Sequence, residues 1–319
     1  HGESKYIDCL ERTLYNGVIS GMSMDGGRFF YPNPLSSDGK YAFNADNTKT
    51  RQPWFGCACC PSNLCRFIPS VPGYLYGVKD NNIYVNLFAG NTSTIKVQGK
   101  DVVLEETTEY PWNGDIKISV KKSGVKNANL LIRIPGWARN QVVPSDLYKY
   151  SDAEKPAYTV TVNGKAVEAD LDANKGYLPV KNIKKGDVIR IHFDMPIRTV
   201  VANNKVADDK GKVAVERGPL VYCAEAVDNN NEPVLRAVMA KKPTFTLVDN
   251  YSIQNTETKG APAFSVKAIK TDAQVLEEGA NGISVKNDKL TLIPYYAWNH
   301  RGANEMNVWF IQSLSMLDK

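Results

Sequence analysis

Residues 158–167 have the sequence YTVTVNGKAV, in which apolar and polar residues alternate up to an Asn-Gly pair. Alternation with a period of two is typical of a strand with one buried face, and Asn163-Gly164 is a pair that two-residue hairpin turns prefer. The stretch therefore predicts a β-hairpin. Short strands of this kind, separated by turn pairs, favour antiparallel sandwiches. The same alternation recurs at Ile83/Val85/Leu87, Ile116/Ile118/Val120 and Ile189/Ile191/Phe193.

A helix is predicted near the start of the chain. In residues 5–21 apolar side chains recur at helical spacing, and Gly21 is expected to end the helix. Residues 28–31, Arg-Phe-Phe-Tyr, form an extended run that Pro32 ends. Pro61 predicts the start of a short helix, because a missing N–H costs little in a first turn.

Three further expectations concern charged and polar segments. Glu105, Glu106 and Glu109 lie in the strand-rich part, and we expect them on a solvent-exposed face rather than in a catalytic acid pair. Residues 199–215 are predicted to be a polar connector. The run 306–314 predicts a final strand.

Composition excludes several classes of protein. The 319 residues include 39 Lys and Arg and 34 Asp and Glu, so the net charge is only +5. Such a balance argues against a nucleic-acid-binding arm or an acidic tail. No run of about 18 apolar residues is present, so no membrane span is predicted. The chain starts without the apolar core of a signal peptide, and we expect it to be a fragment of a longer protein.

Four of the six cysteines lie within nine residues, at positions 57, 59, 60 and 65. This spacing is poor for a disulfide framework, whereas soft sulfur ligands suit zinc. A thiolate metal site and a group of inert cysteines in a tight turn both remain open. A metal would need at least two ligands from elsewhere. Cys59 and Cys60 directly precede the helix predicted at Pro61, where the helix dipole favours a thiolate.

The remaining candidate residues are interpreted as structural. His192 lies in a strand-like context and His300 in a turn-like one, and neither has a metal-ligand spacing to the cysteines. We therefore expect both to have structural roles. Trp137, Trp298 and Trp309 are expected to pack in cores or at domain interfaces.

Several segments together resemble one family of carbohydrate-active enzymes. Taken in order along the chain, they are similar to the C-terminal part of glycoside hydrolase family 127, the β-L-arabinofuranosidase family. The resemblance extends from residue 4 to residue 314. The segments are Glu11-Arg12-Thr13-Leu14-Tyr15-Asn16-Gly17-Val18, Arg28-Phe29-Phe30-Tyr31-Pro32-Asn33-Pro34-Leu35, Cys57-Ala58-Cys59-Cys60-Pro61-Ser62-Asn63, Ile132-Arg133-Ile134-Pro135-Gly136-Trp137-Ala138, Glu216-Arg217-Gly218-Pro219-Leu220-Val221-Tyr222 and Ile293-Pro294-Tyr295-Tyr296-Ala297-Trp298-Asn299-His300-Arg301-Gly302.

The resemblance implies a mainly β chain that begins with the tail of an (α/α)6 barrel. Residues 1–75 would be the C-terminal remnant of this catalytic barrel. Two antiparallel β-sandwich domains would follow, at 76–198 and at 199–302. Residues 303–319 would form a strand that returns to the first sandwich.

The resemblance also implies a zinc-dependent retaining glycosidase. Cys59 would correspond to the nucleophile and to a zinc ligand, and Cys60 to a second zinc ligand. Cys57 would be a neighbour without an assigned role. The general acid/base glutamate and the remaining zinc ligands would lie upstream of this chain. Tyr31 could contact the sugar, although an aromatic core position is the other interpretation.

The resemblance implies a plant-derived carbohydrate as substrate and zinc as cofactor of the parent protein. The chain alone is expected to be inactive and free of zinc, because two cysteines do not complete a zinc site. We expect no nucleic-acid partner, and a homodimer is compatible with the family. Localisation is unknown, with a lean on substrate grounds to the periplasm or exterior of a bacterium. Two alternatives are a non-catalytic carbohydrate-binding β-sandwich module and a structural domain of a zinc protein.

Overall fold

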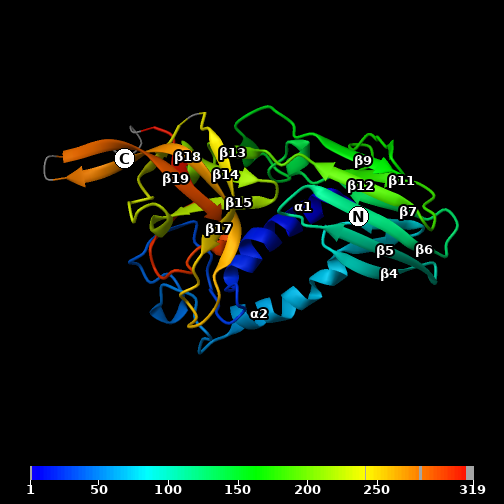
Figure 1. Ribbon diagram of the computed structural model, residues 1–319, viewed down its shortest axis with the longest axis horizontal. Helices are drawn as coiled ribbons and strands as arrows, with labels where there is room; N and C mark the ends of the chain where they lie inside the picture. The colour runs from blue at the N-terminus through cyan, green and yellow to red at the C-terminus, as the bar shows by residue number, and fades with distance from the viewer. Residues whose placement is uncertain (1, 241, 280–281, 314–319) are drawn as a thin grey trace. The chain divides into compact units, whose positions relative to one another are not determined.

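The computed structural model describes residues 2–240, 242–279 and 282–313. The chain is mainly β, as predicted, and its strands form three sheets (Figure 1). Two compact units divide the chain. The first unit comprises His1–Glu11, Ile68–Asp146 and Ala153–Pro196, and the second comprises Arg12–Phe67, Leu147–Asp152 and Ile197–Lys319.

The first unit contains a six-stranded sheet, in the order β10-β9-β12-β6-β5-β4, and a four-stranded sheet, in the order β11-β7-β3-β2. Alternate residues of its strands are buried, which is the pattern expected of strands with one apolar face. The strands are β2 (Tyr76–Lys79), β3 (Asn82–Val85), β4 (Asn91–Val97), β5 (Lys100–Thr108), β6 (Asp115–Ser123), β7 (Asn129–Arg133), β9 (Tyr158–Val162), β10 (Lys165–Ala166), β11 (Tyr177–Val180) and β12 (Val188–Phe193).

The hairpin predicted around Asn163-Gly164 is confirmed. Val162 pairs with Lys165 across a two-residue loop that joins β9 to β10. Asn163 has φ 51° and Gly164 has φ 81°. A type I′ turn needs positive φ at both central residues, which is why Asn-Gly is favoured there.

A helical run opens the chain, as predicted for residues 5–21. It consists of α1 (Ser4–Arg12), a π-helical turn at Thr13–Val18 and a 3₁₀ turn at Ile19–Gly21, after which Met22 is extended. In the first unit, α1 is held by the buried Arg133 of β7. The guanidinium lies 2.8 Å from Asp8 Oδ1 and also pairs with Glu11.

The same cluster explains the burial of Trp137. The Tyr110 hydroxyl donates a hydrogen bond of 2.7 Å to Glu11, and Trp137 Nε1 donates one of 3.2 Å to the Tyr110 oxygen. Trp137 lies in the short 3₁₀ turn Trp137–Arg139 and is buried. This tryptophan is therefore a core residue, as expected.

An eleven-stranded sheet dominates the second unit, in the order β1-β20-β15-β19-β18-β16-β21-β14-β13-β8, with β17 paired to β18. Helix α2 (Cys59–Phe67) and several 3₁₀ turns belong to the same unit. The strands are β1 (Ser36–Asp38), β8 (Tyr148–Tyr150), β13 (Ile197–Ala202), β14 (Lys212–Arg217), β15 (Leu220–Glu225), β16 (Ala237–Met239), β17 (Phe245–Ile253), β18 (Phe264–Gly279), β19 (Gly282–Pro294), β20 (Glu305–Asn307) and β21 (Phe310–Ile311).

Two expectations about the strands are wrong. The segment 303–319 does not return to the first sandwich in its described part, because β20 pairs with β15 and β21 pairs with β14 in the eleven-stranded sheet. The end of the run 306–314 and residues 315–319 lie outside the described residues. Residues 199–215 are not simply a connector, since β13 and β14 occupy both ends of that range. The resemblance, and not a local pattern, implied the return to the first sandwich, and a strand's partner is set by tertiary contacts that local sequence does not identify.

Glu106 corrects a third expectation, because it is buried and only 2% exposed. Its Oε1 accepts a hydrogen bond of 3.1 Å from the Ala89 N–H, and its Oε2 accepts one of 3.0 Å from the Tyr76 hydroxyl. Burial raises the pKa of this carboxyl to about 8, since these hydrogen bonds only partly offset the loss of water. Glu105, its neighbour, is partly exposed and pairs with Lys121, as a surface residue would.

The buried carboxyl predicts a pH dependence of stability. A pKa that is raised on folding stabilises the protein fully below the unfolded pKa, and this contribution is lost as the pH rises through about 8. The free energy of unfolding should therefore fall by about 2 kcal/mol between about pH 6 and about pH 9. Urea unfolding of wild type and of Glu106→Gln checks this, because the neutral amide keeps the Ala89 and Tyr76 contacts. An equally steep fall in the variant would contradict the assignment.

Candidate functional site

Helix α2 (Cys59–Phe67) places two thiols in its first turn. Cys59 and Cys60 are its first residues, and the Ser62 N–H donates the first helical hydrogen bond to the Ala58 carbonyl, at 3.0 Å. The helix thus begins two residues earlier than predicted, and Pro61 lies within the first turn, where its missing N–H has no helical partner to lose. Unpaired N–H groups and the helix dipole favour a thiolate at this end.

A glycine lets α2 approach the first helical run. A Cβ on Gly21 would lie 2.9 Å from Leu64 Cδ1, a distance that real Cβ contacts do not reach. Leu64 is on the second turn of α2. Gly21 therefore both ends the predicted helix and provides the space in which α2 packs.

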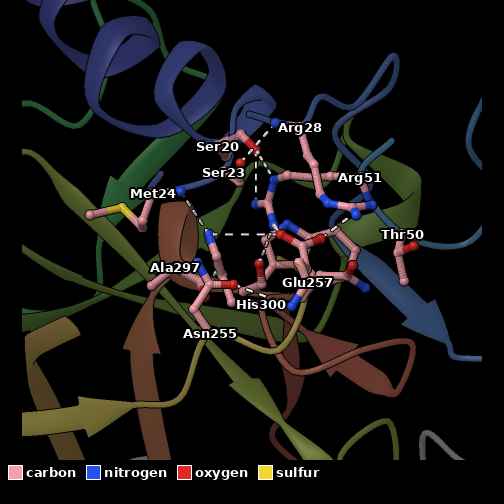
Figure 2. A network of polar contacts seen from close by, with 12 residues as sticks. Ser20, Ser23, Met24, Arg28, Thr50, Arg51, Asn255, Glu257, Ala297 and His300 are labelled. Carbon is pink, nitrogen blue, oxygen red and sulfur yellow. Dashed lines mark hydrogen bonds and ion pairs between the residues drawn. The ribbon is translucent and has the colours of Figure 1, made fainter. Parts of the chain in front are cut away.

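A fully buried arginine fixes the segments around α2. Arg51 is 0% exposed, and its guanidinium donates to the Ser20 carbonyl at 2.9 and 3.1 Å and to the Trp298 carbonyl at 2.9 Å. It also pairs with Glu257 at 3.3 Å and stacks over the Phe30 ring, 4.3 Å from its centroid. Figure 2 shows Arg51 beside Ser20 and Glu257, which lie far from it in the sequence.

The network also determines the role of His300. Its Nε2 accepts a hydrogen bond of 3.0 Å from the Met24 N–H, and its Nδ1–H donates one of 2.9 Å to the Ala297 carbonyl (Figure 2). Burial lowers the pKa of His300 to about 3, so the ring is neutral. Burial raises the pKa of the nearby Glu257 carboxyl to about 7, although the positive charge of Arg51 acts to lower it. His300 is structural, as expected.

The other aromatic and histidine candidates are placed in a similar way. Trp298 is fully buried and stacks with Phe30, at 5.3 Å between ring centroids. Trp309 stacks with Tyr148 at 5.7 Å. His192 is exposed on β12, where its ring contacts Asp115 and Asp194, far from any cysteine in sequence.

Two extended segments hold Tyr31 beside the thiols. Phe29 and Gln52 exchange backbone hydrogen bonds of 2.8 and 2.9 Å, which pairs the run predicted at 28–31 with the segment after Arg51. The Tyr31 N–H donates to Asn44 Oδ1 at 2.9 Å. These contacts of the backbone around Tyr31 therefore hold the residue beside the thiols.

The thiols and the phenol form a small exposed cluster. The Tyr31 hydroxyl lies 3.5 Å from Cys59 Sγ, and Cys57 Sγ lies 4.0 Å from Cys59 Sγ. The hydrogen bond from Tyr31 lowers the pKa of the Cys59 thiol, with Cys57 contributing in the same direction. Desolvation raises the pKa of Cys60. The geometry thus favours Cys59 as the most readily ionised thiol of the group.

The thiol cluster fits part of a zinc site. Cys59 and Cys60 are adjacent in the first turn of α2, and their two thiolates would supply two of the four ligands that a tetrahedral zinc takes. Thiolate is also the ligand chemistry that zinc prefers. In the described part of the chain, no His, Cys, Asp or Glu side chains are grouped as a set of three or more that could hold a metal. The remaining ligands would have to come from outside these residues.

Sequence reasoning missed the buried Arg51–Glu257 pair. The two residues are 206 positions apart, and Glu257 lies in a loop without any motif. No local pattern distinguishes Arg51 from a surface arginine. Only the fold reveals that it is buried.

The described part of the chain contains no helix that is both long enough and apolar enough to cross a membrane.

Comparison with known proteins identifies three matching family models in sequence order. Residues 1–73 match the GH127 catalytic domain of β-L-arabinofuranosidase, residues 82–195 the GH127 middle domain, and residues 197–311 the C-terminal domain of glycoside hydrolase family 127. A curated non-reducing end β-L-arabinofuranosidase from Bifidobacterium longum subsp. longum is 32% identical over 96% of this chain and 45% of its own length.

Solved structures agree with the sequence comparison. A GH127 β-arabinofuranosidase is 50% identical, with a TM-score of 0.88 over 99% of this chain and 47% of that one. A GH127 β-L-arabinofuranosidase from Geobacillus stearothermophilus T6 is 32% identical, with a TM-score of 0.79 over 98% of this chain and 47% of that one. The chain thus spans about half the length of the relatives it matches. On this evidence the chain belongs to glycoside hydrolase family 127.

Proposed function

We propose that this chain is the C-terminal part of a zinc-dependent, retaining β-L-arabinofuranosidase in which Cys59 is the nucleophile. Family membership supports the class of reaction. The observation that carries the assignment to Cys59 is the hydrogen bond of 3.5 Å from the Tyr31 hydroxyl to a thiol at the first turn of α2. Both features favour the thiolate, which is the reactive form of cysteine.

The proposal includes the organisation of the parent protein. Residues 1–75 would be the end of the (α/α)6 barrel, and 76–198 and 199–302 two β-sandwich domains. The ranges of the three family models support these boundaries, apart from the strand pairings corrected above. A homodimer and a bacterial, extracytoplasmic location stay predictions.

In the proposed reaction the Cys59 sulfur attacks the anomeric carbon of the sugar. A carbon–sulfur bond forms as the glycosidic carbon–oxygen bond breaks, and a carboxylic acid upstream of this chain gives its proton to the leaving oxygen. Water then displaces the sulfur in a second inversion, so the configuration is retained overall, and the water's proton goes to the carboxylate. Tyr31 would orient the thiolate and contact the sugar.

Cys59 and Cys60 would hold the zinc, together with ligands from the part of the parent protein upstream. When bound, the metal keeps its sulfur ligands deprotonated near neutral pH. We infer that substrates are β-L-arabinofuranosides of plant-derived glycans, since the relatives are named as β-L-arabinofuranosidases.

The first prediction of the proposed function concerns the nucleophile. In the full-length protein, Cys59→Ser should lower kcat on an aryl β-L-arabinofuranoside by roughly 10³-fold or more, because an alcohol is far less ionised than a thiol. Cys57→Ser is the matched control two residues away and should lose much less. Equal losses in both variants, or activity retained by Cys59→Ser, would refute the role of Cys59.

The second prediction concerns Tyr31. Tyr31→Phe keeps the edge-to-face contact with Phe55, at 4.8 Å between centroids, but removes the hydroxyl. The kcat/KM of the full-length protein should fall about 10-fold to 100-fold, as for loss of a hydrogen bond to a charged group. Alkylation of Cys59 by iodoacetamide should need a higher pH in the variant without substrate. Unchanged kinetics and alkylation would show that Tyr31 only packs.

The third prediction concerns the 319-residue chain by itself. It should not hydrolyse an aryl β-L-arabinofuranoside, because the acid/base carboxyl and the remaining zinc ligands are not among its residues. The assay is run beside the full-length protein, with circular dichroism as the check on folding. Turnover by the isolated, folded chain would contradict the proposal that the acid/base carboxyl and the remaining zinc ligands lie outside it.

A further inference from the structure

The six-stranded sheet of the first unit carries an unusual row of residues on its outer face. Arg190 of β12 lies directly opposite Lys117 of β6, and their outer neighbours are Thr161 on β9 and Thr107 on β5. Directly opposed residues on antiparallel strands have Cβ atoms about 4.5–5.5 Å apart, and like charges in that position repel each other. The row therefore places two cations side by side between two hydroxyl groups.

Neither cation has a counter-charge in the described part of the chain: no carboxylate lies within ion-pair distance of Arg190 or Lys117. The contrast with other lysines of the same sheet is direct. Lys121 pairs with Glu105 at 2.7 Å, and Lys96 pairs with Asp101 at 2.5 Å. A pair of facing, uncompensated cations destabilises the sheet, so an anion from outside the chain would relieve the repulsion.

A hollow of about 400 Å³ lies over these residues. This volume is within the range of small-molecule sites. Its lining carries hydroxyl and charged groups but contains no Phe, Tyr or Trp ring on which a neutral sugar could stack. The side chains that line it are Thr107, Asp115, Lys117, Thr159, Thr161, Arg190 and His192, with Ile116 and Ile191 at its floor.

The next row of the sheet forms the other end of the hollow, where carboxylates replace the cations. His192 lies opposite Asp115 and Thr159, and its Nδ1 contacts Asp115 at 2.7 Å while its Nε2 contacts Asp194 at 3.2 Å. Both contacts raise the pKa of His192. Two carboxylates around one imidazole leave this end negative in either protonation state of the ring, so an anion is favoured only at the Arg190–Lys117 end. Exposed carboxylates and threonine hydroxyls can instead bond the hydroxyl groups of a sugar.

We propose that this outer face is an accessory site for an acidic glycan, with a uronate carboxylate bound between Arg190 and Lys117 and sugar hydroxyls bound toward His192. Arginine binds carboxylates through paired N–H donors, and lysine adds a point charge. A ligand with a carboxylate at one end and hydroxyls at the other matches the two ends of the hollow, whereas a bare inorganic anion uses only one. The site rests on membership of a glycan-hydrolysing family and not on the role of Cys59.

Calorimetric titration of the full-length protein with tetragalacturonate tests the site. Wild type should bind it with an affinity that falls as salt is added. Arg190→Gln and Lys117→Gln should each weaken binding about tenfold or more, while Lys96→Gln, on the same face of the same sheet outside the hollow, should not. Fully methyl-esterified tetragalacturonate, which lacks the charge, should bind weakly to all four proteins.

Two further measurements separate this proposal from its rivals. Arg190→Gln should melt at the same Tm as wild type or higher, because it removes a repulsion, so its loss of binding is not unfolding. Its turnover of a small aryl arabinofuranoside should be unchanged, and Cys59→Ser should still bind tetragalacturonate. Phosphate bound as tightly as tetragalacturonate would mean a simple anion site. That result, absence of binding to wild type, or an equal loss in Lys96→Gln would overturn the glycan assignment.

Discussion

The buried guanidinium of Arg51 is the interaction on which the geometry of the thiol cluster depends. A charge without solvent is costly unless all its hydrogen-bonding groups are satisfied. Arg51 achieves this with the Ser20 and Trp298 carbonyls, the Glu257 carboxylate and the Phe30 ring. These partners come from four separate segments of the second unit. The arginine can be buried only when all four have reached their places.

Segments that Arg51 holds in place are close in sequence to Tyr31 and to Cys59. The residue after Arg51 pairs with Phe29, and this pairing positions Tyr31 two residues further on. The same strand-like segment leads into the turn that carries Cys57 and Cys59. Close packing of α2 on Gly21 fixes the helix itself, and the carbonyl of the neighbouring Ser20 accepts hydrogen bonds from Arg51. The polar network thus supports the cluster through the segments that carry Tyr31 and α2, and its members need no contact with substrate.

Local pattern predicted the elements of this fold better than their partners. Alternation identified β3, β6, β9 and β12, the Asn163-Gly164 turn and the mainly β character, and helical spacing identified the run that ends at Gly21. The resemblance grouped Tyr31 with the cysteine motif, and the structure brings the two within hydrogen-bond distance. The Arg51–Glu257 pair and the pairings of β20 and β21 could not be predicted, because each depends on contacts between residues far apart in sequence.

Glu106 and the Arg190–Lys117 row lie on opposite faces of the six-stranded sheet, one buried and one exposed. Glu106 continues the inner face of Val102 and Leu104, so the pattern itself placed it inside, against the expectation that a glutamate is solvated. No cation accompanies it among the described residues, and it therefore keeps its proton. The two outer cations differ, because they lie opposite each other on the outer face of the sheet. A buried acid can become neutral by holding its proton, whereas the repulsion between two facing cations is relieved by a bound anion.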